Sequence, residues 1–100
     1  MRGAMTLEQI ETILRGHKDR LDAFGVKSLR LFGSFARGED RQESDVDVLV
    51  EFEGPATFSG YMGLSDFLEE VLGRRVDLVT TKALREPIRD EILREAKRVA

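Results

Sequence analysis

The sequence has no cysteine, no tryptophan and only two prolines. Without cysteine there is no disulfide framework and no thiolate zinc site, which fits a cytosolic, cytoplasmic protein. No apolar run approaches the roughly 18 residues that span a bilayer. The opening MRGAM also lacks the apolar region of a signal peptide, so we expect no membrane association and expect residues 1–5 to be disordered.

The composition predicts a single globular domain over residues 1–100. Apolar residues make up 41% of the chain and charged residues 35%, and the apolar residues recur with clear periodicity. Both features argue against intrinsic disorder. A chain of this length buries one core and leaves little room for a second domain, a lid or a deep substrate pocket.

Charge is unevenly distributed around a net value of −3. Residues 37–53 carry two basic against seven acidic side chains, a balance of −5, whereas residues 82–100 carry six basic against four acidic ones, a balance of +2. A dense negative patch repels nucleic acid and phosphates unless divalent cations bridge the contact. Because simple nucleic-acid-binding modules usually carry net positive charge, we expect no direct nucleic-acid binding.

Strand and helix periodicities alternate along the chain. The predicted helices span residues 7–21, 59–72 and 87–99, and a short helical turn is expected at 34–37. The predicted strands span residues 28–32, 46–52 and 75–80. Thr6 is a candidate N-cap, Gly73 a C-terminal stop and Pro87 a first-turn residue. The last helix is expected to share an apolar face among Ile88, Ile92, Ala96 and Val99. The alternation predicts an α/β fold with a small sheet.

Two aspartates open the clearest predicted strand. Asp45 and Asp47 are two residues apart, so in a strand both carboxylates project from the same face. Two carboxylates this close repel each other and raise one pKa unless a cation lies between them. Paired hard oxygen ligands are what Mg²⁺ or Mn²⁺ takes while keeping waters for substrate phosphates. The pair therefore predicts a divalent-metal site.

A Gly-Ser step ends the preceding strand and supplies the features of a phosphate site. Gly33 has no Cβ, so an anion can approach its backbone closely. Ser34 offers a hydroxyl where helix N–H groups point outward. The run GSFARGED also matches the start of a P-loop, but Glu39 stands in the lysine position and would repel phosphates, which excludes that motif. Gly-Ser and Asp-x-Asp are each common alone. Together, at the ends of neighbouring predicted strands, they strongly indicate a combined phosphate and metal site.

Asp77 is the candidate third acid. It lies between Val76 and Leu78 in a predicted strand, so these two apolar side chains share one face and Asp77 occupies the other. An isolated aspartate at this position would be an edge-strand residue facing solvent. Beside a strand that carries Asp45 and Asp47, we favour a third metal ligand or a general base.

The remaining candidates have competing interpretations. Arg37 could reach a phosphate or could pair with Glu39 or Asp40. His17 lies on the apolar stripe of the first helix, where a half-buried structural role is expected. Lys82 could contact a nucleotide, although a solvated lysine is the expectation. The aromatic group expected in the core, and not as a base-stacking platform, is Phe58, Tyr61, Met62 and Phe67. The cations expected on a solvated helix face are Arg85, Arg89, Lys97 and Arg98.

The run GSFARGEDRQESDVDVLVEF, followed by LGRRVDLVT, resembles the minimal nucleotidyltransferase (MNT) proteins of the polymerase-β-like superfamily. The family signature is Gly-Ser, about ten residues, Asp-x-Asp, and a third acid on a later strand. The positions that match it are Gly33, Ser34, Asp45, Asp47 and Asp77. The resemblance runs from about Leu7 to Val99 and implies a small mixed β-sheet flanked by helices, the minimal polymerase-β-like nucleotidyltransferase fold.

The resemblance also implies an activity. It implies transfer of a nucleoside monophosphate, AMP from ATP in the leading interpretation, with two Mg²⁺ ions held by Asp45 and Asp47. Asp77 would share one ion and help deprotonate the acceptor hydroxyl. Gly33 and Ser34 would grip the β- and γ-phosphates, with Arg37 as a further candidate for nucleotide binding. Two metal ions that bind the attacking and the leaving oxygen are known to catalyse in-line displacement.

The implied partner is a second protein. Many MNT proteins are antitoxins encoded beside a helical HEPN-type toxin, and some transfer AMP to a tyrosine of that toxin. A metal-bearing strand pair in so short a domain is an open shelf, which an acceptor protein or a second subunit of a homo-oligomer must complete. The alternative is a non-catalytic antitoxin that neutralises its partner by occlusion. A third hypothesis, a transferase that modifies a small molecule, has less support, because no substrate-binding domain is present.

Overall fold

The computed structural model describes residues 6–33, 45–55 and 57–100. Its elements, in chain order, are the helices and strands α1 (Leu7–Arg15), α2 (Lys18–Ala23), β1 (Val26–Phe32), β2 (Val46–Phe52), α4 (Phe58–Leu72), β3 (Val76–Thr80), the 3₁₀ turn η1 (Thr81–Ala83), α5 (Ile88–Glu95) and β4 (Lys97–Arg98). The predicted helical turn at 34–37 and the N-terminal residues 1–5 lie outside the described residues.

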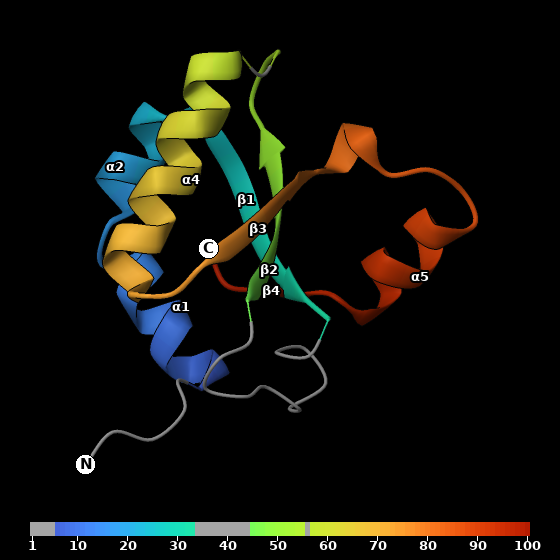
Figure 1. Ribbon diagram of the computed structural model, residues 1–100, viewed down its shortest axis with the longest axis horizontal. Coiled ribbons are helices and arrows are strands. Elements are labelled where there is room, and N and C mark those ends of the chain that lie inside the picture. Colours follow the sequence, from blue (N-terminus) through green and yellow to red (C-terminus); the bar gives the residue numbers. More distant parts are fainter. Residues whose placement is uncertain (1–5, 34–44, 56) are drawn as a thin grey trace.

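The four strands form one mixed sheet in the order β3-β2-β1-β4. β1 pairs antiparallel with β2 and with β4, while β2 pairs parallel with β3. Helices α1, α2 and α4 lie together on one side of the sheet, and α5 stands on the other side (Figure 1). The small mixed sheet with helices that the sequence predicts is therefore confirmed.

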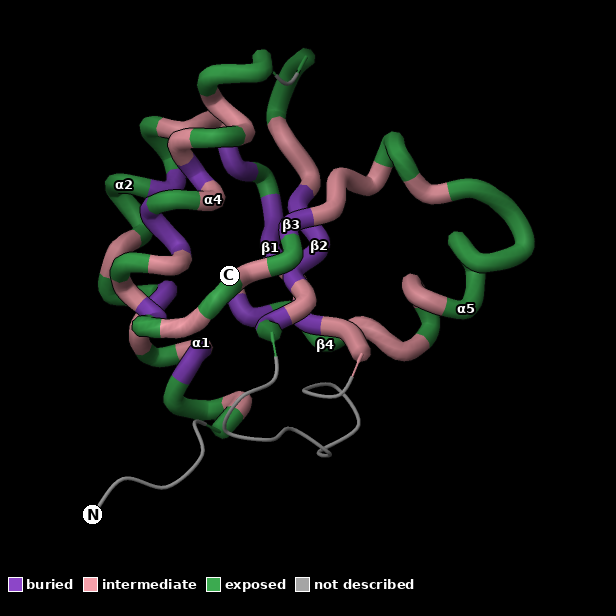
Figure 2. Tube along the Cα trace, in the orientation of Figure 1, coloured by how far each residue is buried: buried purple, intermediate pink, exposed green. Residues whose placement is uncertain are grey.

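The core lies between the sheet and the helix group α1, α2 and α4 (Figure 2). β2 contributes Val46, Val48 and Val50, each with no exposed area, as the strict alternation of this strand predicts. α4 contributes Leu64 and Leu68, also with no exposed area. The side of β2 that carries these valines is thus committed to packing, whereas its other side carries the half-buried Asp47 and the buried Leu49.

The prediction of one continuous helix over residues 7–21 is wrong, because the structure has two helices there. α1 ends at Arg15 and α2 begins at Lys18, because Gly16 is a poor helix former and His17 adopts a non-helical backbone with φ −115°. His17 Nδ1 lies 2.9 Å from the carbonyl oxygen of Ile13, and its ring packs edge-on against Phe67. The half-buried structural role expected for His17 is consistent with these contacts.

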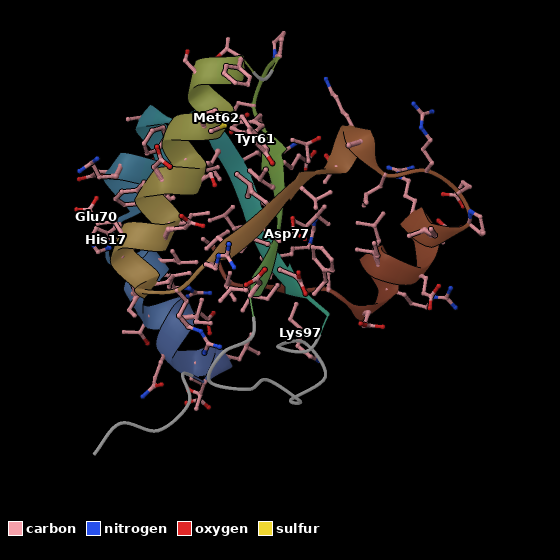
Figure 3. All side chains as sticks on the ribbon, viewed as in Figure 1. His17, Tyr61, Met62, Glu70, Asp77 and Lys97 are labelled. Atoms are coloured by element: carbon pink, nitrogen blue, oxygen red, sulfur yellow. The ribbon has the colours of Figure 1, made fainter. Side chains whose placement is uncertain are left out.

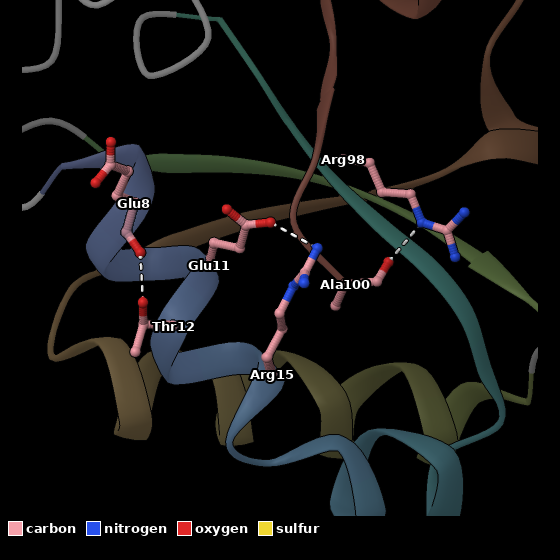
Figure 4. A network of polar contacts seen from close by, with 6 residues as sticks. All are labelled: Glu8, Glu11, Thr12, Arg15, Arg98 and Ala100. Carbon is pink, nitrogen blue, oxygen red and sulfur yellow. Dashed lines mark hydrogen bonds and ion pairs between the residues drawn. The ribbon is translucent and has the colours of Figure 1, made fainter.

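Local polar contacts cap the start of α1 and continue along it. Thr6 accepts from the Gln9 backbone N–H, and the Gln9 side chain accepts from the Thr6 N–H, which completes a capping box. Further along, Thr12 donates to the Glu8 carbonyl and Arg15 pairs with Glu11 at 2.7 Å (Figure 4).

Figure 4 also shows a contact near the C-terminus, where Arg98 Nε donates to the Ala100 carbonyl at 3.0 Å.

The last predicted helix is wrong beyond Glu95. Ala96 has an extended backbone, φ −67° and ψ 143°, and the chain continues as β4. Val99 is fully buried because its N–H donates to the Leu29 carbonyl at 2.9 Å, which places it at the sheet. Ile88, predicted on the same apolar helix face, is 59% exposed.

The other boundaries agree closely with the sequence prediction. β2 has the predicted bounds, α4 begins one residue early, and β1 begins two residues early. Gly73 ends α4 in the left-handed region at φ 67°, as a C-terminal stop requires. Among the helices of the described residues, none is long and apolar enough to cross a membrane.

Candidate functional site

Asp47 and Asp77 are register partners in the parallel pair of β2 and β3. Residues opposite each other on neighbouring strands project from the same face of the sheet. Val46 and Val48, on either side of Asp47, have no exposed area and face the core. Asp47 is half-buried and Asp77, labelled in Figure 3, is exposed. Because their neighbours face the core, both lie on the sheet face opposite α1, α2 and α4. The structure thus brings together two of the three predicted acids.

Asp45 comes directly before β2 and is exposed. The next residue, Val46, donates its N–H to the Arg75 carbonyl at 2.9 Å, so the chain is already tied to the start of β3 here. The two-residue strand period puts Asp45 on the side of Asp47. All three aspartates therefore approach the same end of the β2–β3 pair.

Gly33 lies against the Asp47 carboxylate. Phe32 is the register partner of Asp47, and Gly33 follows it in a left-handed conformation with φ +68°. A Cβ placed on Gly33 would overlap Asp47 Oδ2 and come within 3.2 Å of Cγ. A side chain is disfavoured at Gly33 for two reasons. The backbone angle favours glycine, and the Asp47 carboxylate occupies the position that a Cβ would take.

Two predicted nucleotide-binding residues, Ser34 and Arg37, lie outside the described residues and stay predictions. Asp47 has an interaction of its own in the structure, so its carboxylate is not free. What the described residues establish is the position of Gly33 and of the three aspartates.

The aspartates suit a hard divalent cation, but their side chains do not form a finished ligand cage. Among residues 6–33, 45–55 and 57–100, no three His, Cys, Asp or Glu side chains are grouped closely enough to hold a metal ion. The backbone places Asp47 opposite Asp77, and Asp45 directly precedes the same strand. Carboxylate oxygens placed in this way are ligands that Mg²⁺ takes readily.

Lys82, a candidate nucleotide contact from the sequence, does not join this site. Lys82 is exposed and lines a cavity of about 110 Å³ with Phe52 and Thr80. These residues lie at the ends of β2 and β3, whereas Asp45 and Asp77 lie at their starts. The four other cations are exposed, namely Arg85, Arg89, Lys97 and Arg98, but placing all of them on a helix face is wrong. Only Arg89 lies on α5, while Arg85 precedes it and Lys97 and Arg98 form β4.

The expected aromatic core is only partly present. Phe67 is buried, but Phe58 is 80% exposed and Met62 41% exposed, so placing these two in the core is wrong. They lie one turn apart on the outer side of α4, whose inner side already fills the core. Sequence reasoning also missed Glu69, whose carboxylate reaches β3. No sequence signal marks that contact, because it depends on how α4 packs.

The mixed sheet thus carries aspartates on two adjacent parallel strands, with a glycine turn beside one of them. Residues 10–99 match the nucleotidyltransferase domain family. The chain belongs to this family.

Relatives of known name agree with this assignment. The chain is 46% identical over 92 residues to the protein adenylyltransferase MntA of Thermococcus cleftensis, covering 91% of this chain and 93% of the relative. It is also 38% identical to a minimal nucleotidyltransferase of known structure, with a TM-score of 0.81, covering 96% of this chain and 98% of that chain.

One solved structure resembles this chain in fold alone. It is the complex of tri-AMPylated Shewanella oneidensis HEPN toxin with an MNT antitoxin. The TM-score is 0.66 at 19% identity, covering 95% of this chain and 72% of that chain.

Proposed function

We propose that this protein is a Mg²⁺-dependent protein adenylyltransferase. It transfers AMP from ATP to a hydroxyl of a helical partner protein and acts as the antitoxin of a HEPN/MNT pair. The observation that carries the proposal is the register of Asp47 with Asp77, with Gly33 against the Asp47 carboxylate. The likeness to a named protein adenylyltransferase over 91% of the chain supports AMP transfer to protein.

Asp45, Asp47 and Asp77 would hold the metal ions. When bound, such ions neutralise the phosphate charge and stabilise the attacking and leaving oxygens of an in-line displacement. Mn²⁺ offers the same coordination chemistry to these carboxylates.

The transfer forms one bond and breaks one. The acceptor oxygen bonds to the α-phosphorus of ATP while the bond from that phosphorus to the α–β bridging oxygen breaks, and pyrophosphate leaves. The acceptor proton passes to the Asp77 carboxylate, which is exposed and can meet an incoming hydroxyl. Gly33 leaves its backbone open to a phosphate, and Ser34 and Arg37 are proposed to bind the same phosphates.

The acceptor comes from another molecule. The carboxylates lie on a sheet face that α1, α2 and α4 do not cover (Figure 1). A side chain of a partner protein can reach such a face directly. The complex of an MNT antitoxin with an AMPylated HEPN toxin is a precedent, within the same fold, for an acceptor of this kind.

The test uses the protein encoded beside this one. Purified chain, that neighbour protein, Mg²⁺ and ATP labelled on the α-phosphate are incubated, and label on the neighbour protein is measured. Label that depends on Mg²⁺ and is lost in Asp47→Asn is the expected result. If the two proteins bind tightly without transfer of label, the chain is a non-catalytic antitoxin that acts by occlusion.

A further inference from the structure

We propose that Tyr61 and Glu69 of α4 are positioning residues for the transfer. They bind the outer edge of β3 on both sides of Asp77 and so hold Asp77 in register with Asp47. The inference rests on the proposed function, because it takes Asp77 as part of the metal-binding face.

Glu69 secures the start of β3. β3 is an edge strand, so one side of its backbone has no strand neighbour among the described residues. On that side, the Val76 N–H donates to Glu69 Oε2 at 2.9 Å. A hydrogen bond to an ionised carboxylate is stronger than one between neutral groups. The residue held in this way directly precedes Asp77.

Tyr61 secures the strand just after Asp77. Its hydroxyl donates to the Leu78 carbonyl oxygen from two turns further back along α4. Figure 3 shows Tyr61 on α4 and Asp77 on β3. The two α4 side chains therefore act on the residues immediately before and after Asp77.

Asp77 depends on this support because its own side chain has none. Its carboxylate is exposed and makes no hydrogen bond or ion pair with any residue that the structure describes. Its position is set by the backbone of β3 alone. A one-residue slip of a strand turns every side chain to the opposite face, which would carry Asp77 away from Asp47.

Glu69 also couples the end of α4 to the start of β3. Its backbone carbonyl accepts from the Gly73 N–H at 2.9 Å, which closes the helix, while its carboxylate binds Val76. On the other side of the strand, the Arg75 carbonyl accepts from Val46 at 2.9 Å. The peptide before Asp77 is therefore held by α4 on one side and by β2 on the other.

The experiment compares Glu69→Ala and Tyr61→Phe with the wild type. Glu69→Gln is the rescue variant, since its amide oxygen still accepts from Val76. Glu70→Ala is the matched control, because Glu70 is exposed on the next residue of α4 (Figure 3). ATP binding is measured by calorimetry against Mg²⁺ concentration, and amide hydrogen exchange reports on Val76 and its neighbours.

Glu69→Ala and Tyr61→Phe should each raise the half-saturating Mg²⁺ concentration about two- to tenfold, the range that one hydrogen bond is worth. Glu69→Ala should also speed exchange of the Val76 amide. Glu69→Gln, whose neutral amide oxygen makes a weaker bond than the carboxylate, should lie between Glu69→Ala and the wild type. Glu70→Ala should stay near the wild type. A variant that melts earlier but keeps the wild-type Mg²⁺ dependence would show a merely structural role and overturn the inference. If the wild type itself binds ATP without regard to Mg²⁺, the proposed function fails instead.

Discussion

Gly33 lies so close to the Asp47 carboxylate that a Cβ added to Gly33 would overlap Asp47 Oδ2, so the carboxylate would have to shift. The two residues come from neighbouring antiparallel strands and meet because Phe32 is the register partner of Asp47. The glycine predicted to approach a phosphate and an aspartate predicted to bind metal are thereby side by side, although they are fourteen positions apart in the sequence.

Gly33→Ala tests this contact. The left-handed backbone should cost about 1–2 kcal/mol of folding free energy in any L-residue, and the new Cβ should displace Asp47. Gly25→Ala is the matched control, since Gly25 has φ +82° but open space around its Cβ position. By calorimetry, Gly33→Ala should lose at least tenfold in ATP affinity, about 1.4 kcal/mol, while Gly25→Ala keeps it. Equal ATP affinity in both variants would place the phosphate site elsewhere.

Metal removal tests the carboxylate face as a whole. ATP brings several negative charges to a region that already holds Asp45, Asp47 and Asp77, so binding without a divalent cation should be strongly opposed. Calorimetry in EDTA should show loss of most of the affinity, and Mg²⁺ or Mn²⁺ should restore it. The same affinity in EDTA and in Mg²⁺ would rule out a site built from these three carboxylates.

Asp77→Asn separates chemistry from binding. The amide keeps the size of the side chain but removes its charge and its basic oxygen, so transfer should fall by about 10²–10⁴-fold. Because Asp77 is exposed and makes no contact with the core cluster, folding and complex formation should survive. Transfer is followed with labelled ATP, and folding by the melting temperature.

Asp66→Asn, on the exposed side of α4, serves as the control and should transfer at the wild-type rate. Wild-type transfer in Asp77→Asn would disprove its catalytic role. An inactive Asp77→Asn that still protects cells as well as the wild type would show that neutralisation works by occlusion.

The C-terminal strand makes a prediction about stability. Val99→Ala should lower the free energy of unfolding by about 2 kcal/mol, because the side chain is fully buried. Ile88→Ala should change it by less than about 0.5 kcal/mol, because Ile88 is 59% exposed. Urea denaturation of both variants measures the contrast. Similar losses in the two would indicate that they share one buried helix face.

Part of the site could be predicted without coordinates because its chemistry is local. Asp45 and Asp47 lie on one side since the strand period is two, and the valines between and after them fix which face is buried. Gly33 could be recognised from its place at the end of a strand. By contrast, Phe58 and Met62 could not be placed: both have the spacing of core residues, but the inner side of α4 was already filled.

The sequence by itself determined the elements whose signals lie within a few residues: the alternation of β2, the capping box at Thr6, the glycine stop at Gly73 and the Asp-x-Asp pair. Only the tertiary structure decided that Asp77 is opposite Asp47 and that Glu69 reaches Val76. It also decided that the chain leaves α5 at Ala96 to add β4 beside β1. Periodicity reports which face of a segment is apolar, but pairing between strands is chosen by competition among distant segments for the same backbone donors and acceptors.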